Sequence, residues 1–430
     1  MPWFGRAFSV ARCFSSRPLQ TATAASPSST PAGFPARSSS PPPLLARLLR
    51  EPESGVKETL ELDKETEEAS SPGRKSDALF WEPLLVALRS SSPRKAHLVL
   101  EWKLEKLLEE DVREHKHFSN LITLCAKLEN LPFAMRVFTT MESRGIRSSV
   151  SVFNALIHAC ISSDNVPHAL SLFEIMSRGE DCKPNLATYN AFIAMRSKWG
   201  ESKGMLGWYS AAKSAGFSPD VVTYQALITG FTRAGEFEDA GHYFEEMVAS
   251  GIMPNVDILG CVLEGLCRQK KLGDVEEFWT FLLAGGWDVN ERMVENILSL
   301  YTELSMVEEM EELLKTLQRN LNSTDLLFRV HCGIIKLYAC LDRLDAVEYS
   351  VGRMLRNGMQ FTCSGDVEAV ISCYFRQEAY ERLDLFLERV RRSYRLMKST
   401  YDLLIAGYRR VGLQDRLEVV KKDMKNEGFA

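Results

Sequence analysis

The sequence lacks the motifs by which most enzymes are recognised. It has no G-x-x-x-x-G-K-[ST] loop to cradle a nucleotide phosphate, and none of its seven histidines stands in an H-x-E arrangement. No two of its ten cysteines are spaced as C-x-x-C, which excludes the zinc half-site of a nucleobase deaminase. We therefore predict no catalytic residue, no metal site and no cofactor, and we interpret acidic strings such as EELL and VEEM as solvated helix surfaces.

Other absences bear on where the chain resides. There is no uninterrupted apolar run of about 18 residues, so a membrane span is not expected. The cysteines are scattered through helical segments, which favours a reducing compartment and roles in packing.

The first 50 residues contain six Arg, no Lys and no acid, and they are rich in Ser and Pro. This composition is typical of an organellar transit peptide, which we assign to residues 1–50, the alternative being a tail with no address. The string ARCFSSRP resembles a mitochondrial processing site, so we predict a mitochondrial location. Chloroplast is the alternative, because plastid leaders share the Ser-rich composition.

Acidic charge dominates the rest of the chain. The formal net charge is −5, so after the six Arg of the leader residues 51–430 carry −5 − 6 = −11. Proteins that bind nucleic acid usually have the opposite sign. Binding to RNA would therefore require cations concentrated on one face.

What the sequence does have is a repeat. Residues 150–255 contain SVSVFNALIHAC, LATYNAFIAMRS and VVTYQALITGFT, and Tyr189 and Tyr224 stand 35 residues apart. A period of this size predicts a solenoid. In one copy the positions i, i+3, i+4 and i+7 are Tyr224, Leu227, Ile228 and Phe231. That spacing places them on one face of a helix, and a second amphipathic helix follows each first one.

Each repeat is thus a helix hairpin whose apolar face is covered only by stacking on its neighbours, which predicts an all-α solenoid. The predicted repeats are 115–149, 150–185, 186–220, 221–255, 256–290 and 291–325. We expect a disordered acidic linker over 51–77, a degenerate helix pair acting as a cap over 78–114, and degenerate repeats with a C-terminal cap over 326–430.

The copy VVTYQALITGFTRAGEFEDAGHYFEEMVASGIMPN resembles a P-type pentatricopeptide repeat. The 35-residue period, the V-x-T-Y-x-x-L-I opening and the G-x-x-P-N ending distinguish it from the tetratricopeptide pattern. The resemblance implies a right-handed α-solenoid of helix-turn-helix repeats that binds single-stranded RNA in a plant organelle, one base per repeat.

In that family the fifth and last residues of a repeat read the base and the second residue wedges it. Mapped here, the reading pairs are Ser119/Ser149, Asn154/Asn185, Asn190/Asp220 and Gln225/Asn255, followed by Gly260/Asn290 and Glu295/Asp325, which depart from the family pattern. Asn190/Asp220 resembles a uridine reader and Asn154/Asn185 a pyrimidine reader favouring cytidine. Ala187 and Val222 are the predicted wedges. A structural interpretation of the same Asn residues is that they are solvated or cap helices.

Four cations occupy the thirteenth position of their repeats. They are Lys127, Lys198, Arg233 and Arg268, and the last three are spaced by 35 residues. Stacking would align them into a row suited to RNA phosphates. The alternative is that cations are simply favoured near the negative end of a helix dipole.

Two functional hypotheses follow. The first is a protein that binds organellar RNA and acts by occupancy, in stabilisation, processing, splicing or translation. With three or four good readers its selectivity would be modest, so a ribosomal or RNA-processing protein partner is plausible. The second is a helical scaffold for protein in an organellar ribosome or RNA-processing complex, with little readout of RNA.

Overall fold

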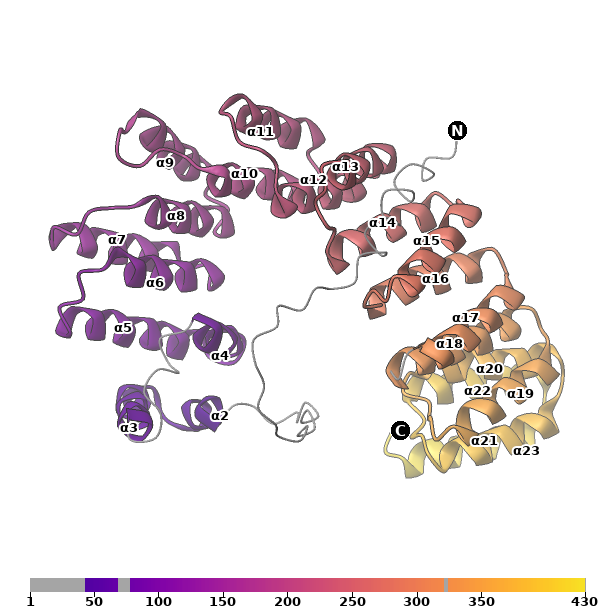
Figure 1. Cartoon of the computed structure of the whole chain (residues 1–430). Coiled ribbons are helices and arrows are strands. Elements are labelled where there is room, and N and C mark those ends of the chain that lie inside the picture. The colour runs from indigo at the N-terminus through magenta and orange to yellow at the C-terminus, as the bar shows by residue number, and fades with distance from the viewer. Residues whose placement is uncertain (1–42, 69–77, 321–323, 430) are drawn as a thin grey trace, which may run out of the picture. The chain divides into compact units, whose positions relative to one another are not determined.

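The computed structural model describes residues 43–68, 78–320 and 324–429, and all regular secondary structure in these residues is helical (Figure 1). The prediction of an all-α solenoid is confirmed. The described residues divide after Ile252 into two compact units, called here the N-terminal unit and the C-terminal unit. No helix in the described part of the chain is long and apolar enough to cross a membrane.

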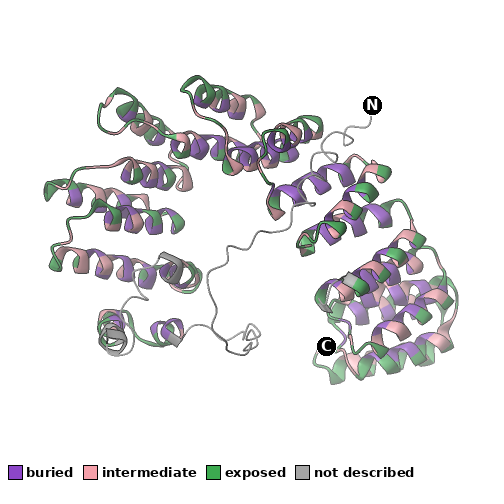
Figure 2. Cartoon of the chain, viewed as in Figure 1, coloured by how far each residue is buried: buried purple, intermediate pink, exposed green. Residues whose placement is uncertain are grey.

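The N-terminal unit consists of successive helix pairs. Its helices are α2 (Pro43–Arg50), the 3₁₀ helix η1 (Glu53–Gly55), α3 (Val56–Glu68), α4 (Ala78–Ser91), α5 (Pro93–Glu109), α6 (His115–Lys127), α7 (Leu131–Ser143), α8 (Val150–Ser162), α9 (Val166–Arg178), α10 (Leu186–Trp199), α11 (Ser202–Ser214), α12 (Val221–Ala234) and α13 (Phe237–Ala249). The first helices α6, α8, α10 and α12 pack in series, and each also packs against its own second helix. Buried residues lie along these contacts (Figure 2).

Helix α12 shows how the repeat pattern produces this packing. Tyr224 and Phe231 are each 1% exposed, and Leu227 and Ile228 between them are fully buried, so the apolar stripe covers one helix face. The helix ends at Gly235, which has a φ of 78° in the left-handed region where a side chain would be strained. The chain can then turn at once into α13.

Residues 43–68 are helical where the sequence indicated the end of a leader and a disordered linker. Residues 43–50, placed in the leader, form α2, and Val56 and Leu60 of α3, placed in a disordered linker, are buried in the core. The linker averages as acidic and polar, but these two apolar residues are four apart and share one helix face. Lys95 fixes the segment further, since its ammonium group donates to the carbonyls of Leu48, Leu49 and Glu51 at 2.6–2.9 Å. The rest of the predicted leader and linker, 1–42 and 69–77, lies outside the described residues.

The C-terminal unit continues the pairing of helices. Its helices are α14 (Val256–Arg268), α15 (Leu272–Ala284), α16 (Glu291–Glu303), α17 (Val307–Asn320), α18 (Thr324–Cys340), α19 (Leu344–Arg356), α20 (Ser364–Arg376), α21 (Tyr380–Arg391), α22 (Lys398–Val411) and α23 (Gln414–Asn426). Helix α18 has 17 residues where most first helices have 13, which accounts for the slip of the repeat phase seen in the sequence after Leu326.

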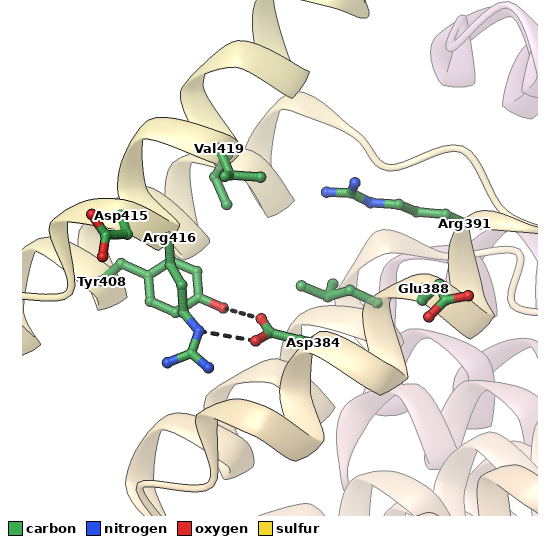
Figure 3. A pocket seen from close by; sticks show the side chains of 9 residues that line it. Asp384, Glu388, Arg391, Tyr408, Asp415, Arg416 and Val419 are labelled. Atoms are coloured by element: carbon green, nitrogen blue, oxygen red, sulfur yellow. Dashed lines mark hydrogen bonds and ion pairs between the residues drawn. The ribbon is translucent and has the colours of Figure 1, made fainter.

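Charged side chains on second helices connect neighbouring repeats in this unit. Asp384 on α21 accepts from the hydroxyl of Tyr408 at 3.2 Å and from Arg416 of α23 at 2.9 Å (Figure 3). One repeat earlier, Glu348 accepts in the same way from Tyr374 and Arg382. Each such carboxylate joins neighbouring repeats, and the groove beside Asp384 has a volume of about 420 Å³.

Candidate nucleic-acid interface

Two of the predicted reading pairs meet in the N-terminal unit. The amide nitrogen of Asn190, on α10, donates to Asp220 Oδ1 at 3.1 Å. The amide nitrogen of Asn154, on α8, donates to Asn185 Oδ1 at 3.2 Å. In both cases residues about 30 positions apart become one polar site, because stacking places the start of each first helix beside the previous first helix.

Helix capping explains where the second member of each pair sits. Asn185 and Asp220 are the N-caps of α10 and α12, and their Oδ1 atoms accept from the backbone N–H groups of Thr188 and Thr223. Each threonine hydroxyl also accepts from the backbone N–H of its capping residue, which completes a capping box. Capping, which the sequence suggested as an alternative for Asn154 and Asn190, is instead the role of their partners Asn185 and Asp220, where it coexists with pairing.

The other predicted pairs behave differently. Ser119 is only 8% exposed, and its hydroxyl donates to the carbonyl of Ser151 at 3.1 Å, while Ser149 Oγ lies 2.8 Å from Ser151 Oγ. Both serines therefore contact Ser151 and are not bonded to each other. Gln225 belongs to the N-terminal unit and Asn255 to the C-terminal unit, so that pair stays a prediction.

The predicted wedge residues lie in the open. Val222, at the second position of α12, is 55% exposed, and Ala187 at the same position of α10 is also exposed. Each precedes the buried threonine of the capping box by one residue. An exposed valine beside a polar pair offers apolar surface against which a base could stack.

The predicted cationic row is only partly available. Lys127 forms an ion pair with Glu82 at 3.0 Å, and Arg268 forms one at 2.7 Å with Glu264, a carboxylate that it shares with Arg292, so both cations have partners within the protein. Arg233 donates to the carbonyl of Ser197 in the last turn of α10, at 3.4 Å. This contact supports the helix-dipole interpretation of the position. Lys198 is exposed and makes no hydrogen bond or ion pair within the described residues.

Two of the corresponding positions of the C-terminal unit form internal contacts. Glu295 on α16 pairs with Arg329 of α18, and Glu368 on α20 accepts from the hydroxyls of Ser399 and Thr400 at 2.7 and 3.1 Å. At Gly260 there is no side chain, and an added Cβ would lie 4.0 Å from Asn290 Nδ2. A cavity of about 600 Å³ follows this face, with Arg329, Lys336 and Asp366 among its lining residues.

Titratable groups with shifted pKa values serve packing. Burial raises the pKa of Tyr209, and so does the carboxylate of Glu246, to which its hydroxyl donates at 2.9 Å. His331 on α18 is fully buried; burial and then the nearby Arg353 charge lower its pKa to about 4. Within the described residues no group of three or more His, Cys, Asp or Glu side chains could hold a metal ion.

These helix pairs define the class of protein, a helical-repeat protein in which Asn154 and Asn190 each pair with the capping residue of the next first helix. Residues 106–284 match the family model described as the pentacotripeptide-repeat region of PRORP. Over these residues the chain is similar to pentatricopeptide repeats, which agrees with the resemblance seen in the sequence.

Comparison with relatives and solved structures supports the assignment. Two chloroplastic pentatricopeptide repeat-containing proteins, the PPR5 homolog of Oryza sativa and PPR5 of Zea mays, are 31% and 30% identical over 96 residues. Those matches span 21% of this chain and 19% of each relative. The fold is similar to that of PPR10 in complex with an 18-nt psaJ RNA element, with a TM-score of 0.52 and 16% identity, covering 89% of this chain and 55% of PPR10.

Proposed function

We propose that this protein binds single-stranded RNA through the amide pairs of its N-terminal unit. The observation that carries the proposal is the meeting of Asn154 with Asn185 and of Asn190 with Asp220. After these bonds each reading Asn amide keeps one N–H and its carbonyl lone pairs, the two functions needed to pair with a pyrimidine edge. Asn154 is half-buried and Asn190 is 5% exposed, so a base would have to lie directly against the first helices to reach them. Val222 adds an apolar surface for stacking.

The protein would act by occupancy and not by catalysis. A strand held along these amide pairs would be shielded from nucleases or kept open for other factors, which suits RNA stabilisation, processing, splicing or translation. No chemistry is required of the protein, in keeping with an interface built from amides, hydroxyls and few free cations.

An organelle is the proposed location. The relatives with matching repeats are named as chloroplastic, whereas the leader composition favours mitochondria. Import of the full chain into isolated plant chloroplasts and mitochondria, followed by protease protection, separates the two locations.

The alternative function, a protein scaffold, is favoured by one observation in the C-terminal unit. There the residues equivalent to the readers are Glu295, which pairs with Arg329, and Glu368, which accepts from the Ser399 and Thr400 hydroxyls. A unit whose fifth-position side chains already have partners within the protein would suit contact with a protein partner. The two functions are compatible if the two units divide them.

The test is binding of labelled single-stranded RNA by the full chain at 50 and 200 mM salt. We expect retention to fall with salt because phosphate contacts release counterions, though with few free cations the fall should be shallow. Asn190→Ala combined with Asp220→Ala should weaken binding of a uridine-containing RNA by roughly tenfold or more. Unchanged affinity of the double variant would favour the scaffold function.

A further inference from the structure

The threonine at the third position of a repeat contacts the reading residue of the repeat before it. Thr223 Oγ1 lies 2.8 Å from Asn190 Oδ1, and Thr188 Oγ1 lies 2.7 Å from Asn154 Oδ1. Both threonines are buried, with exposures of 1% and 0%. Each reading Asn is therefore held from both sides by the following repeat, which supplies the capping residue and the hydroxyl.

The hydrogen-bond network determines which way the Asn190 amide points. Asp220 Oδ1 can only accept, and it already receives the backbone N–H of Thr223 at 2.8 Å. The atom of Asn190 that faces it must therefore be the donor, Nδ2. Oδ1 of Asn190 is left facing the hydroxyl of Thr223. A flipped amide would set two acceptor oxygens against each other.

The hydroxyl hydrogen of Thr223 has two acceptors within reach. Asp220 Oδ1 is also 2.8 Å away, but that oxygen already accepts two hydrogen bonds. Asn190 Oδ1 has no other donor within the described residues, and the Thr223 oxygen itself accepts from the Asp220 backbone at 3.2 Å. The Thr223 hydroxyl therefore donates its hydrogen to Asn190 Oδ1.

The same hydrogen bonds fix the amide of Asn154 one repeat earlier, where the capping residue is the neutral Asn185 in place of an aspartate. The backbone N–H of Thr188 fixes Oδ1 of Asn185 at 3.1 Å. That oxygen receives Nδ2 of Asn154, so Oδ1 of Asn154 faces the hydroxyl of Thr188. Two independent sites thus use the same device.

A repeat without the hydroxyl shows the contrast. Val152 occupies the third position of the repeat that follows Ser119, and it offers no donor. The Ser119 hydroxyl turns to the backbone carbonyl of Ser151 instead. Ile258 and Met293 fill the same position later in the chain, and they too lack a hydroxyl.

We propose that Thr188 and Thr223 are positioning residues that determine base specificity, each acting on the reader of the preceding repeat. This inference rests on the proposed RNA-binding function. The capping residue determines which end of the amide faces it, and the threonine hydroxyl holds the carbonyl end, so the two together present one N–H and one carbonyl lone pair in a set geometry. Without the hydroxyl the amide keeps its orientation but loses one of its two ties, so it can tilt and tolerate other base edges.

The experiment selects RNA with the full chain from a pool of short single-stranded RNAs randomised at every position. Wild type is compared with Thr223→Val, which removes the hydroxyl but keeps the shape, and with Thr223→Ser, which restores it. Thr232→Val is the matched control, because Thr232 is also buried on α12 and its hydroxyl donates only to the carbonyl of Ile228 in its own helix. Base frequencies at each position of the retained RNAs are the readout.

We expect Thr223→Val to reduce uridine enrichment at a single position by about tenfold, the discrimination of one good base contact, while other positions keep their preferences. Thr223→Ser and Thr232→Val should retain the wild-type pattern. Thr188→Val should flatten a different position. If Thr223→Val does not fold, Thr223→Ala takes its place, since it fits the same space without a hydroxyl.

Two results overturn the inference. In one, the Val variant keeps every base preference. In the other, binding weakens equally at all positions and the Ser variant does not rescue it, which marks a purely structural capping role. A wild-type protein that retains RNA with no enriched base, or retains none, refutes base reading itself and so the proposed function as well.

Discussion

The same helix positions do different work in the two units. In the N-terminal unit the fifth-position residues Asn154 and Asn190 meet neutral or capping partners and keep hydrogen-bonding capacity on the amide. In the C-terminal unit the equivalent Glu295 is neutralised by Arg329, and Glu368 is capped by two hydroxyls. A repeat can therefore preserve its stacking while its fifth position changes from an amide to a carboxylate with different partners.

The difference has a physical cause. A carboxylate at the fifth position is most stable with a cation beside it, and the second position of the next repeat supplies one in Arg329. That second position is where Val222 and Ala187 stand open in the N-terminal unit. The Glu295–Arg329 ion pair thus occupies both the reading position and the wedge position.

The largest expected effect comes from removing both reading Asn side chains. Asn154→Ala with Asn190→Ala should reduce affinity for the best selected RNA by about a hundredfold, since each base contact contributes roughly 1–3 kcal/mol. Fluorescence anisotropy measures it. The matched control is Glu295→Ala with Glu368→Ala, which should leave RNA affinity within about twofold if these carboxylates do not read bases. Equal losses in the two variants would contradict the division between units.

Acid should destabilise the C-terminal unit through His331. Its folded pKa of about 4 lies below the unfolded value of 6.5, so the unfolded state binds the proton more readily. The stability tied to neutral His331 is complete above pH 6.5 and is lost as the pH falls from 6.5 to about 4, by about 3 kcal/mol at most.

Urea unfolding of wild type and His331→Leu at pH 7.5 and pH 4.5 isolates this contribution. Carboxylates titrate alike in both proteins, so the variant should lose less stability on acidification. Identical losses would show that His331 is not buried as a neutral group.

A smaller loss is expected from the half-buried ion pair of α18 and α20, in which the Lys336 side chain is 45% exposed. Asp366 is 4% exposed and pairs with Lys336. Asp366→Asn should destabilise the protein by about 2 kcal/mol, because it leaves the Lys336 charge without its partner. Thermal melting reports the change, and Asp402→Asn, an exposed acid at the fifth position of α22 with no contact in the described residues, serves as the control. RNA affinity should be unchanged by either variant.

The smallest expected effect is a gain in base selectivity, produced by adding a reading residue at Gly260 in the C-terminal unit. Gly260→Asn fits sterically, since the added Cβ meets Met293 Cε at 3.6 Å and Asn290 Nδ2 at 4.0 Å. It should improve selectivity at one further nucleotide by only about two- to threefold, less than a full base contact, because Met293 supplies no hydroxyl to orient the amide. Base-frequency analysis of selected RNAs measures the gain. A full tenfold gain would show that the threonine is dispensable.

Much of this organisation could be predicted from the sequence. The 35-residue period located the helix pairs, and the family resemblance placed Asn190 opposite Asp220 and Asn154 opposite Asn185. The sequence did not reveal that Lys127 and Arg268 form ion pairs, because their partners Glu82 and Glu264 have no fixed position in the repeat. The burial of α2 and α3 could not be predicted from composition either, because an acidic average conceals the two apolar residues Val56 and Leu60 on one face of α3.

Periodicity by itself determined the helix pairs, their boundaries and their apolar faces, because local spacing dictates which side of a helix can be buried. Whether a polar residue at a given register reads, caps or forms an ion pair was decided only by the tertiary structure. Hydrogen bonds and charges act over a few ångströms, and the atoms that satisfy Asn190 or Glu295 come from a neighbouring repeat some 30 residues along the chain.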